Sequence, residues 1–221
     1  MKSDLKITSA KKDLINVSKS FYTRGWMLGT SGNLSILIDE PAIRQTGEPA
    51  KNFQFLITAS GKDKGELTED DFLLVDINGN PAENGSLKPS AETLLHSAIY
   101  KHTSAKAVFH VHTTNSTLLS MQNTECGVQN GIEFSGLEML KGLGFKTHEV
   151  KINIPIIENS QDMKYLASIA PSYINEDVPG LILKGHGIYA WGKSVQEAKR
   201  HVEIFEFLFE YRVKELTLRK N

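Results

Sequence analysis

The stretch Ala107-Val108-Phe109-His110-Val111-His112, near the middle of the chain, predicts a β-strand. Side chains two residues apart on a strand point to the same face of the sheet. His110 and His112 therefore face a common point, while Phe109 and Val111 pack behind them. Two imidazoles on one strand face suit a zinc ion, which binds histidine nitrogen at about 2.0–2.1 Å. The alternative is a pair of histidines on a solvated face.

Outward from this strand, apolar periodicity divides the chain into further helices and strands. Leu94, Leu95, Ala98 and Ile99 form a helical stripe that begins after Ser90, which we expect to be the N-cap. Additional strands are predicted at residues 34–38, 53–58, 72–77, 150–157, 181–183 and 188–191. Additional helical stretches are predicted near residues 115–121, 136–143 and 162–174.

Both ends of the sequence predict helices. Leu14, Val17 and Phe21 are spaced as on a helix that ends near Gly25. At the other end, Ser194 and Glu197 have the spacing of a capping box, and apolar residues follow on one side. Residues 40–52, which contain two prolines and a glycine, predict a loop.

The order of these elements predicts the fold class. Because the strands do not alternate regularly with helices, a doubly wound parallel sheet is disfavoured. We expect instead an α/β protein with a mainly antiparallel central sheet flanked by helices. The sequence contains no repeat and no interdomain linker, so residues 1–221 are expected to form a single domain.

Composition narrows the possible partners and the compartment. The 25 basic and 26 acidic residues give a net charge of -1 without a basic block, so neither nucleic acid nor a membrane surface is an expected partner. The single cysteine, Cys126, excludes an internal disulfide and fits a reducing compartment. No apolar run approaches the roughly 18 residues of a transmembrane helix. We therefore expect a cytoplasmic protein.

A third histidine strengthens the metal hypothesis. His186 lies between Gly185 and Gly187, in a turn between two apolar segments. Three histidine ligands leave the fourth position of a tetrahedral zinc ion open, which is the pattern of catalytic sites. Iron and cobalt also accept imidazole, so the metal remains open at this point. The alternative for His186 is a polar residue at the tip of a hairpin.

Two carboxylates and two glycine turns complete the candidate residues. Glu92 lies in the first turn of a predicted helix, where it would be an acid/base group or a transient metal ligand, or would simply favour the helix dipole. Glu138 lies in a second predicted helix, and the pattern alone does not distinguish it from a surface residue. The turns Thr30-Ser31-Gly32-Asn33 and Ser60-Gly61 offer N–H and hydroxyl donors of the kind that bind phosphate, or merely reverse the chain.

In combination, five motifs resemble the class II aldolase/adducin family over residues 10–212. They are Gly29-Thr30-Ser31-Gly32-Asn33-Leu34-Ser35, Ile57-Thr58-Ala59-Ser60-Gly61, Lys88-Pro89-Ser90-Ala91-Glu92, His110-Val111-His112 and Gly185-His186-Gly187. The resemblance implies a three-layer α/β/α fold and a homotetramer with active sites near subunit boundaries. It also implies one zinc ion on His110, His112 and His186, and phosphate binding by the residues Thr30, Ser31, Gly32, Asn33, Ser60, Gly61 and Ser90.

Within that family, the chain is most similar to the ketose-phosphate dehydratases of methionine salvage. The similarity is carried by the segments 88–96, 137–142, 155–159 and 186–192. It implies a small phosphorylated ketose as substrate and Glu138 as the general acid/base. Glu92 occupies the position of the catalytic glutamate of sugar-phosphate aldolases, so an aldolase or a pentulose-phosphate epimerase stays open. A non-catalytic, adducin-like binding domain is a further alternative.

Overall fold

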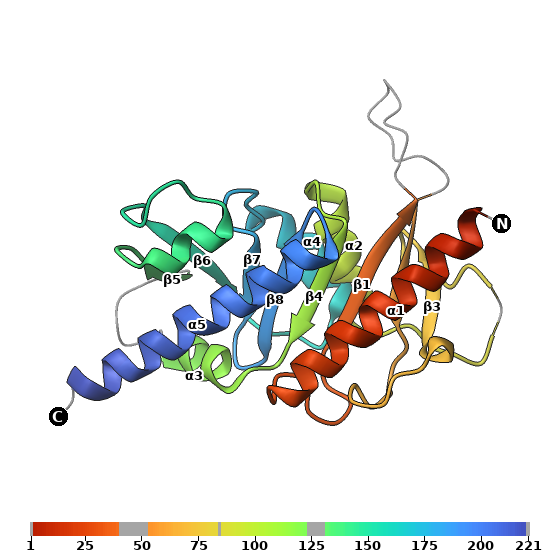
Figure 1. Cartoon of the computed structure of the whole chain (residues 1–221), viewed down its shortest axis with the longest axis horizontal. Helices are drawn as coiled ribbons and strands as arrows, with labels where there is room; N and C mark the ends of the chain where they lie inside the picture. Colours follow the sequence, from red (N-terminus) through yellow and green to blue (C-terminus); the bar gives the residue numbers. More distant parts are fainter. Residues whose placement is uncertain (1, 40–52, 84, 123–130, 220–221) are drawn as a thin grey trace, which may run out of the picture.

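A computed structural model describes residues 2–39, 53–83, 85–122 and 131–219 of the chain (Figure 1). The loop expected at residues 40–52 and Cys126 lie outside the described residues. Within the described part, no helix has the length and apolar character needed to cross a membrane.

The centre of the fold is an eight-stranded sheet in the order β3-β2-β1-β4-β8-β7-β6-β5. Neighbouring strands are antiparallel except for β6 and β7, which are parallel. The expected mainly antiparallel sheet is therefore confirmed. The strands are β1 (Asn33–Asp39), β2 (Gln54–Thr58), β3 (Phe72–Asp76), β4 (Ala107–Val111), β5 (Gly131–Phe134), β6 (Ile152–Ile157), β7 (Gly180–Leu183) and β8 (Gly187–Gly192).

Helices pack on both faces of this sheet. The helical elements are α1 (Lys2–Thr23), η1 (Glu69–Asp71), α2 (Thr93–His102), α3 (Thr114–Gln122), η2 (Glu138–Leu143), α4 (Met163–Ile169), η3 (Ala170–Ser172) and α5 (Val195–Arg219). Buried residues of α1, α3 and α5 share one apolar core, and those of α2 and α4 share a second. Figure 1 shows α1 and α5 crossing the same face of the sheet.

The central strand β4 sets the direction in which its histidine points. Ala107, Phe109 and Val111 pack into the core under α1 and α5, whereas Val108 packs into the core under α2. Because side chains alternate along a strand, His110 faces the α2 side of the sheet. It is fully buried there, and its backbone pairs with Asn33 of β1 and Tyr189 of β8.

Three predicted details differ from the structure. The helix expected at residues 136–143 is a 3-10 helix over Glu138–Leu143. Its buried residues Leu140 and Leu143 are three apart, which matches the three residues per turn of a 3-10 helix. Ser90 is not the N-cap of α2, because Glu92 holds that position; the Ser90 hydroxyl accepts hydrogen bonds from the Asn33 amide and from the Glu92 backbone N–H. The four-residue strand β5, which pairs with β6, was not predicted, since it is short and includes a glycine.

Candidate functional site

Three histidines reach a common point from two parts of the sheet. His110 belongs to β4, and His112 is the second residue after it, just past the end of that strand. His186 lies in the tight turn between β7 and β8, where its N–H donates to the Leu183 carbonyl at 3.1 Å. Gly185 has a φ of +66° in this turn, a conformation that glycine adopts readily.

The three imidazoles converge through the same ring nitrogen. The Nε2 atoms of His110 and His112 are 2.8 Å apart, those of His112 and His186 are 3.0 Å apart, and those of His110 and His186 are 3.4 Å apart. Three nitrogens bound tetrahedrally to one zinc ion at about 2.0–2.1 Å would be about 3.3 Å apart. The observed triangle is close to this size, so the residues fit a single metal ion.

The protonation of the histidines also suits a metal. His110 Nδ1 lies 3.0 Å from the Ile188 carbonyl oxygen, so Nδ1 carries the proton and Nε2 presents its lone pair. Burial lowers the pKa of His110 to about 4, and burial together with the neighbouring imidazoles lowers the pKa of His112 to about 3. Both rings are therefore neutral near pH 7, which is the form that binds metal.

Glu92 completes this group from the start of α2. Its Oε1 is 3.0 Å from His186 Nε2, and its Oε2 is 3.5 Å from His110 Nε2. One ligand atom from each of the four residues lies within 4.8 Å of the others. Burial raises the pKa of the Glu92 carboxyl, but the facing His110 and His186 and the Asn33 amide lower it by more. Glu92 is therefore a carboxylate.

A cavity of about 230 Å³ adjoins these residues. All seven residues expected to bind phosphate line it, together with Glu92, His112 and His186. The Ser31 hydroxyl donates to Leu28 and stabilises its own turn, whereas the Thr30 and Ser60 hydroxyls make no hydrogen bond to another described residue. The structure thus joins the two glycine turns and the metal-binding group in a single hollow.

Lys64 is a cavity residue that sequence reasoning missed. Its side chain is almost wholly buried, and its Nζ donates to the carbonyl oxygens of Thr30 at 3.0 Å and Lys62 at 2.8 Å. Burial lowers the pKa of Lys64 to about 8. It therefore remains largely charged at pH 7 and brings a cation to the cavity. Its position in the loop that begins at Gly61 was the signal available in the sequence.

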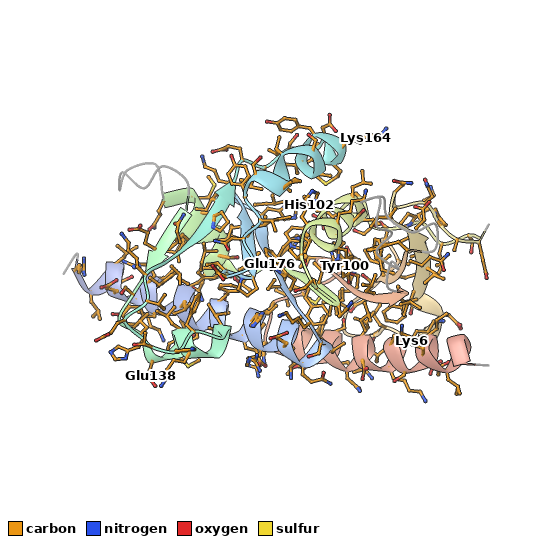
Figure 2. The ribbon with its side chains drawn as sticks, turned by 90° about the horizontal axis from the view of Figure 1, so that it is seen from above. Lys6, Tyr100, His102, Glu138, Lys164 and Glu176 are labelled. Atoms are coloured by element: carbon orange, nitrogen blue, oxygen red, sulfur yellow. The ribbon has the colours of Figure 1, made fainter. Side chains whose placement is uncertain are left out.

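Glu138 lies apart from this group. Its side chain is 72% exposed, and Figure 2 shows it at the outer edge of the molecule. It pairs with Lys141 at 2.8 Å, which lowers the pKa of Glu138, and lies 3.6 Å from His148. Glu138 is not one of the described residues that line the cavity.

Comparisons with known proteins match nearly the whole chain. The family described as class II aldolase and adducin N-terminal domain matches residues 12–213. A methylthioribulose-1-phosphate dehydratase of Geobacillus kaustophilus is 45% identical over 210 residues, covering 95% of this chain and 93% of the relative. A protein with the same name from Bacillus subtilis is 46% identical over 208 residues, covering 94% of this chain and 93% of the relative.

Two solved structures of other proteins have the same fold as this chain. An L-fuculose-1-phosphate aldolase from Thermus thermophilus superposes with a TM-score of 0.69 at 20% identity and covers 98% of both chains. Another L-fuculose 1-phosphate aldolase superposes with a TM-score of 0.71 at 23% identity, covering 95% of this chain and 87% of the other. At these identities, the likeness concerns the fold alone.

Proposed function

This chain belongs to the class II aldolase and adducin family, and from that premise we propose that it removes water from 5-methylthioribulose 1-phosphate. The product is 2,3-diketo-5-methylthiopentyl 1-phosphate, and the reaction is a step of methionine salvage. The enzyme is thus a hydro-lyase. The two relatives with the dehydratase name reported above are 45% and 46% identical over nearly the full chain, which supports this activity above the others of the family.

One observation carries the proposal. Three imidazoles with converging Nε2 atoms lie beside a cavity lined by two glycine turns and a buried lysine. A ketose phosphate needs both parts, because its phosphate requires donors and its carbonyl requires an electrophile. A non-catalytic binding domain has no need of such a ligand set, so the binding-domain alternative is disfavoured.

We assign one zinc ion per chain to His110, His112 and His186. A zinc ion held there would act as a Lewis acid on the carbonyl of the substrate and make the neighbouring C–H more acidic. The protein's own contribution begins with the phosphate, which Thr30, Ser60 and Lys64 and the other cavity residues would bind. This contact fixes the distance between the phosphate and the reacting carbons.

The remaining chemistry is a proton transfer by a carboxylate. We assign it to Glu138, which would take a proton from C3 and return one to the C4 hydroxyl as that group leaves as water. An exposed glutamate away from its own chain's cavity can do this at the metal of a neighbouring subunit. Glu138 therefore fits a homotetramer with sites at its boundaries, and the exposed Phe207 and Tyr211 of α5 are suited to such contacts.

A second hollow lies beside the metal group, and its lining suits the methylthio end of this substrate. It has a volume of about 320 Å³ and is lined by the histidine ligand His112 and by residues of α3 that include Leu118 and Met121. His112 also lines the phosphate cavity, so it lies between the two. We propose that the apolar methylthio group of the substrate occupies this second hollow.

We infer a single domain over residues 1–221, with the helices on the two sheet faces as the outer layers of an α/β/α arrangement. We also infer a cytoplasmic enzyme. Its partners are the ketose phosphate and its own subunits, without nucleic acid or membrane.

The alternative activity is that of an aldolase or a 4-epimerase acting on another ketose phosphate. The position of Glu92 favours it, because its carboxylate is 3.0 Å from His186 Nε2 in the same chain. In that case Glu92, rather than Glu138, would be the acid/base.

Product identity separates these activities. We would incubate the zinc-loaded protein with 5-methylthioribulose 1-phosphate and record the product by mass spectrometry, with and without a chelator. We expect the loss of one water, abolished by the chelator. The dehydratase assignment would be rejected by cleavage of the substrate into two smaller products, or by a product of unchanged mass with inverted stereochemistry. It would also be rejected if the folded, zinc-loaded protein gave no reaction.

A further inference from the structure

A row of buried polar side chains joins β1 to α2 behind the metal group. Asn33 and Ser35 are two residues apart on β1, and Glu92, His96 and Tyr100 follow one another at intervals of four along α2 and its N-cap. The strand repeat of about 6.8 Å nearly matches the helical repeat of about 6 Å. The two sets of side chains can therefore interleave in register.

Every member of this row is bonded to the next. The Tyr100 hydroxyl lies 2.8 Å from Ser35 Oγ, and Ser35 Oγ lies 2.7 Å from His96 Nδ1. His96 Nε2 bonds to Asn33 Oδ1, and Asn33 Nδ2 bonds to Glu92 Oε2. Asn33, Ser35, His96 and Tyr100 are all nearly inaccessible to solvent, and Tyr100 is labelled near the middle of the view in Figure 2.

The Glu92 carboxylate at one end of the row fixes the direction of these hydrogen bonds. The Glu92 carboxylate only accepts, so the Asn33 amide must present its NH₂ to Glu92 and its oxygen to His96. Asn33 Nδ2 also lies 3.2 Å from Ser90 Oγ. His96 must then donate from Nε2 and accept at Nδ1 from the Ser35 hydroxyl, whose oxygen accepts from Tyr100. Burial lowers the pKa of His96 to about 3, so it has a single N–H to give.

We propose that His96 is a positioning residue that holds the Asn33 amide in one orientation and thereby directs the Glu92 carboxylate toward the metal ligands. A reversed Asn33 amide would turn its oxygen to the carboxylate and repel it. With His96 in place, a reversed amide would also set NH₂ against the N–H of Nε2. Reversal is therefore opposed at both ends, and Glu92 keeps its Oε1 beside His186 Nε2 at 3.0 Å.

This role differs from simple packing in what it requires of residue 96. Packing between β1 and α2 would be satisfied by an apolar side chain of similar size. Positioning requires a donor at the place of Nε2. The two roles therefore predict opposite rankings for an apolar and an amide replacement, which is the basis of the test.

The experiment compares His96→Leu with His96→Gln, whose side-chain NH₂ can reach Asn33. His201→Leu is the matched control, because His201 is also buried but donates to the Trp191 carbonyl from α5. Each protein is loaded with Co²⁺, and its visible absorption spectrum, Co²⁺ affinity, thermal midpoint and kcat and KM for dehydration are measured. The spectrum reports the surroundings of the metal without any need for turnover.

We expect His96→Leu to change the Co²⁺ spectrum, because a displaced Glu92 carboxylate alters the surroundings of the metal ligand His186. For the same reason, kcat should fall at least tenfold, with KM within about threefold. His96→Gln should lie closer to the wild type in both readouts, and His201→Leu should match the wild type. Ser35→Ala and Tyr100→Phe should give progressively smaller effects, because they remove links farther from Glu92.

Wild-type spectrum and kcat in His96→Leu would overturn the proposal. So would a His96→Gln protein impaired as much as His96→Leu. The kinetic part rests on the proposed dehydratase function, whereas the spectral part does not. A wild type that fails to dehydrate, but whose Co²⁺ spectrum responds to His96→Leu and not to His201→Leu, would reject the function and retain the positioning role.

Discussion

At the scale of single residues, His112 has the most proposed roles. It is one of three ligands to the proposed metal and borders both the phosphate cavity and the apolar hollow. We predict that His112→Ala lowers zinc affinity by more than about 100-fold, because loss of a direct ligand should exceed the 10–100-fold effect of losing an outer partner. Competition with a chromophoric chelator measures this affinity.

The control for this variant is His102→Ala. His102 is an exposed histidine of α2 whose Nδ1 lies 2.9 Å from the Ala98 carbonyl, so its removal should leave zinc affinity unchanged. If His112→Ala bound zinc as tightly as His102→Ala, the ligand assignment would be wrong.

The sequence predicted some of these residues and missed others for a physical reason. Alternation along one strand is a local rule, so His110 and His112 could be paired without a structure. Local patterns also made His186 and the two glycine turns candidates, and the resemblance to the family joined them into one site; the structure brings them into one cavity. The sequence patterns did not predict the roles of Lys64 and His96, because these roles depend on contacts between segments more than 30 residues apart in the chain.

At the scale of elements, the turn before β1 is fitted tightly against β4. A Cβ atom on Gly32 would lie 2.6 Å from the His110 carbonyl oxygen, and the φ of Gly32 is +73°. Gly25 has a similar φ of +76°, but nothing lies within 4 Å of its Cβ position. The two glycines thus differ in crowding and share the same backbone conformation.

We predict that Gly32→Ala lowers the free energy of unfolding by more than Gly25→Ala does. The left-handed conformation should cost each variant roughly 1–2 kcal/mol, and crowding should add roughly 1–3 kcal/mol at position 32 alone. Chemical denaturation of both variants measures the difference. Equal losses of stability would show that the contact between Gly32 and β4 is less close than described.

The elements themselves were predicted where periodicity was long or alternation was clear. Helices α1 and α5 and the strands β1, β2, β3, β4, β6, β7 and β8 fall where the pattern put them. The strand β5 did not stand out, because its four residues include a glycine and are too few to show a clear alternation. The helical stretch at Glu138 is a 3-10 helix, for which the spacing of three between Leu140 and Leu143 was a sign in the sequence.

At the scale of the whole molecule, the order of the strands could not be derived from the sequence. Antiparallel pairing was expected, but the position of β4 between β1 and β8 is a long-range feature. That position brings the Thr30 turn, the His110 strand and the His186 turn together. The family resemblance supplied this arrangement in outline, and local patterns did not.

A prediction at this scale concerns the proposed sharing of sites between subunits. His112→Ala and Glu138→Gln should each be nearly inactive as pure proteins, because one lacks the metal and the other lacks the acid/base. In a mixed oligomer, a site can combine an intact His112 from one subunit with an intact Glu138 from its neighbour. With random assembly, about a quarter of the sites would be complete.

We therefore expect co-refolding of the two inactive variants in equal amounts to restore about a quarter of wild-type activity per site. Each variant refolded alone and then mixed without exchange is the control. A co-refolded sample that remains as inactive as its parents would contradict the cross-subunit role of Glu138.

The central claim is that the three histidines hold zinc while the adjoining cavity holds the phosphate of the substrate. A crystal structure of the zinc-loaded protein with the C2-alcohol analogue of the substrate, which cannot react, tests both parts in one measurement. The account predicts an anomalous zinc peak about 2.0–2.1 Å from the Nε2 atoms of His110, His112 and His186, with the phosphate against Thr30, Ser60 and Lys64. Zinc bound elsewhere, or a phosphate outside that cavity, would contradict it.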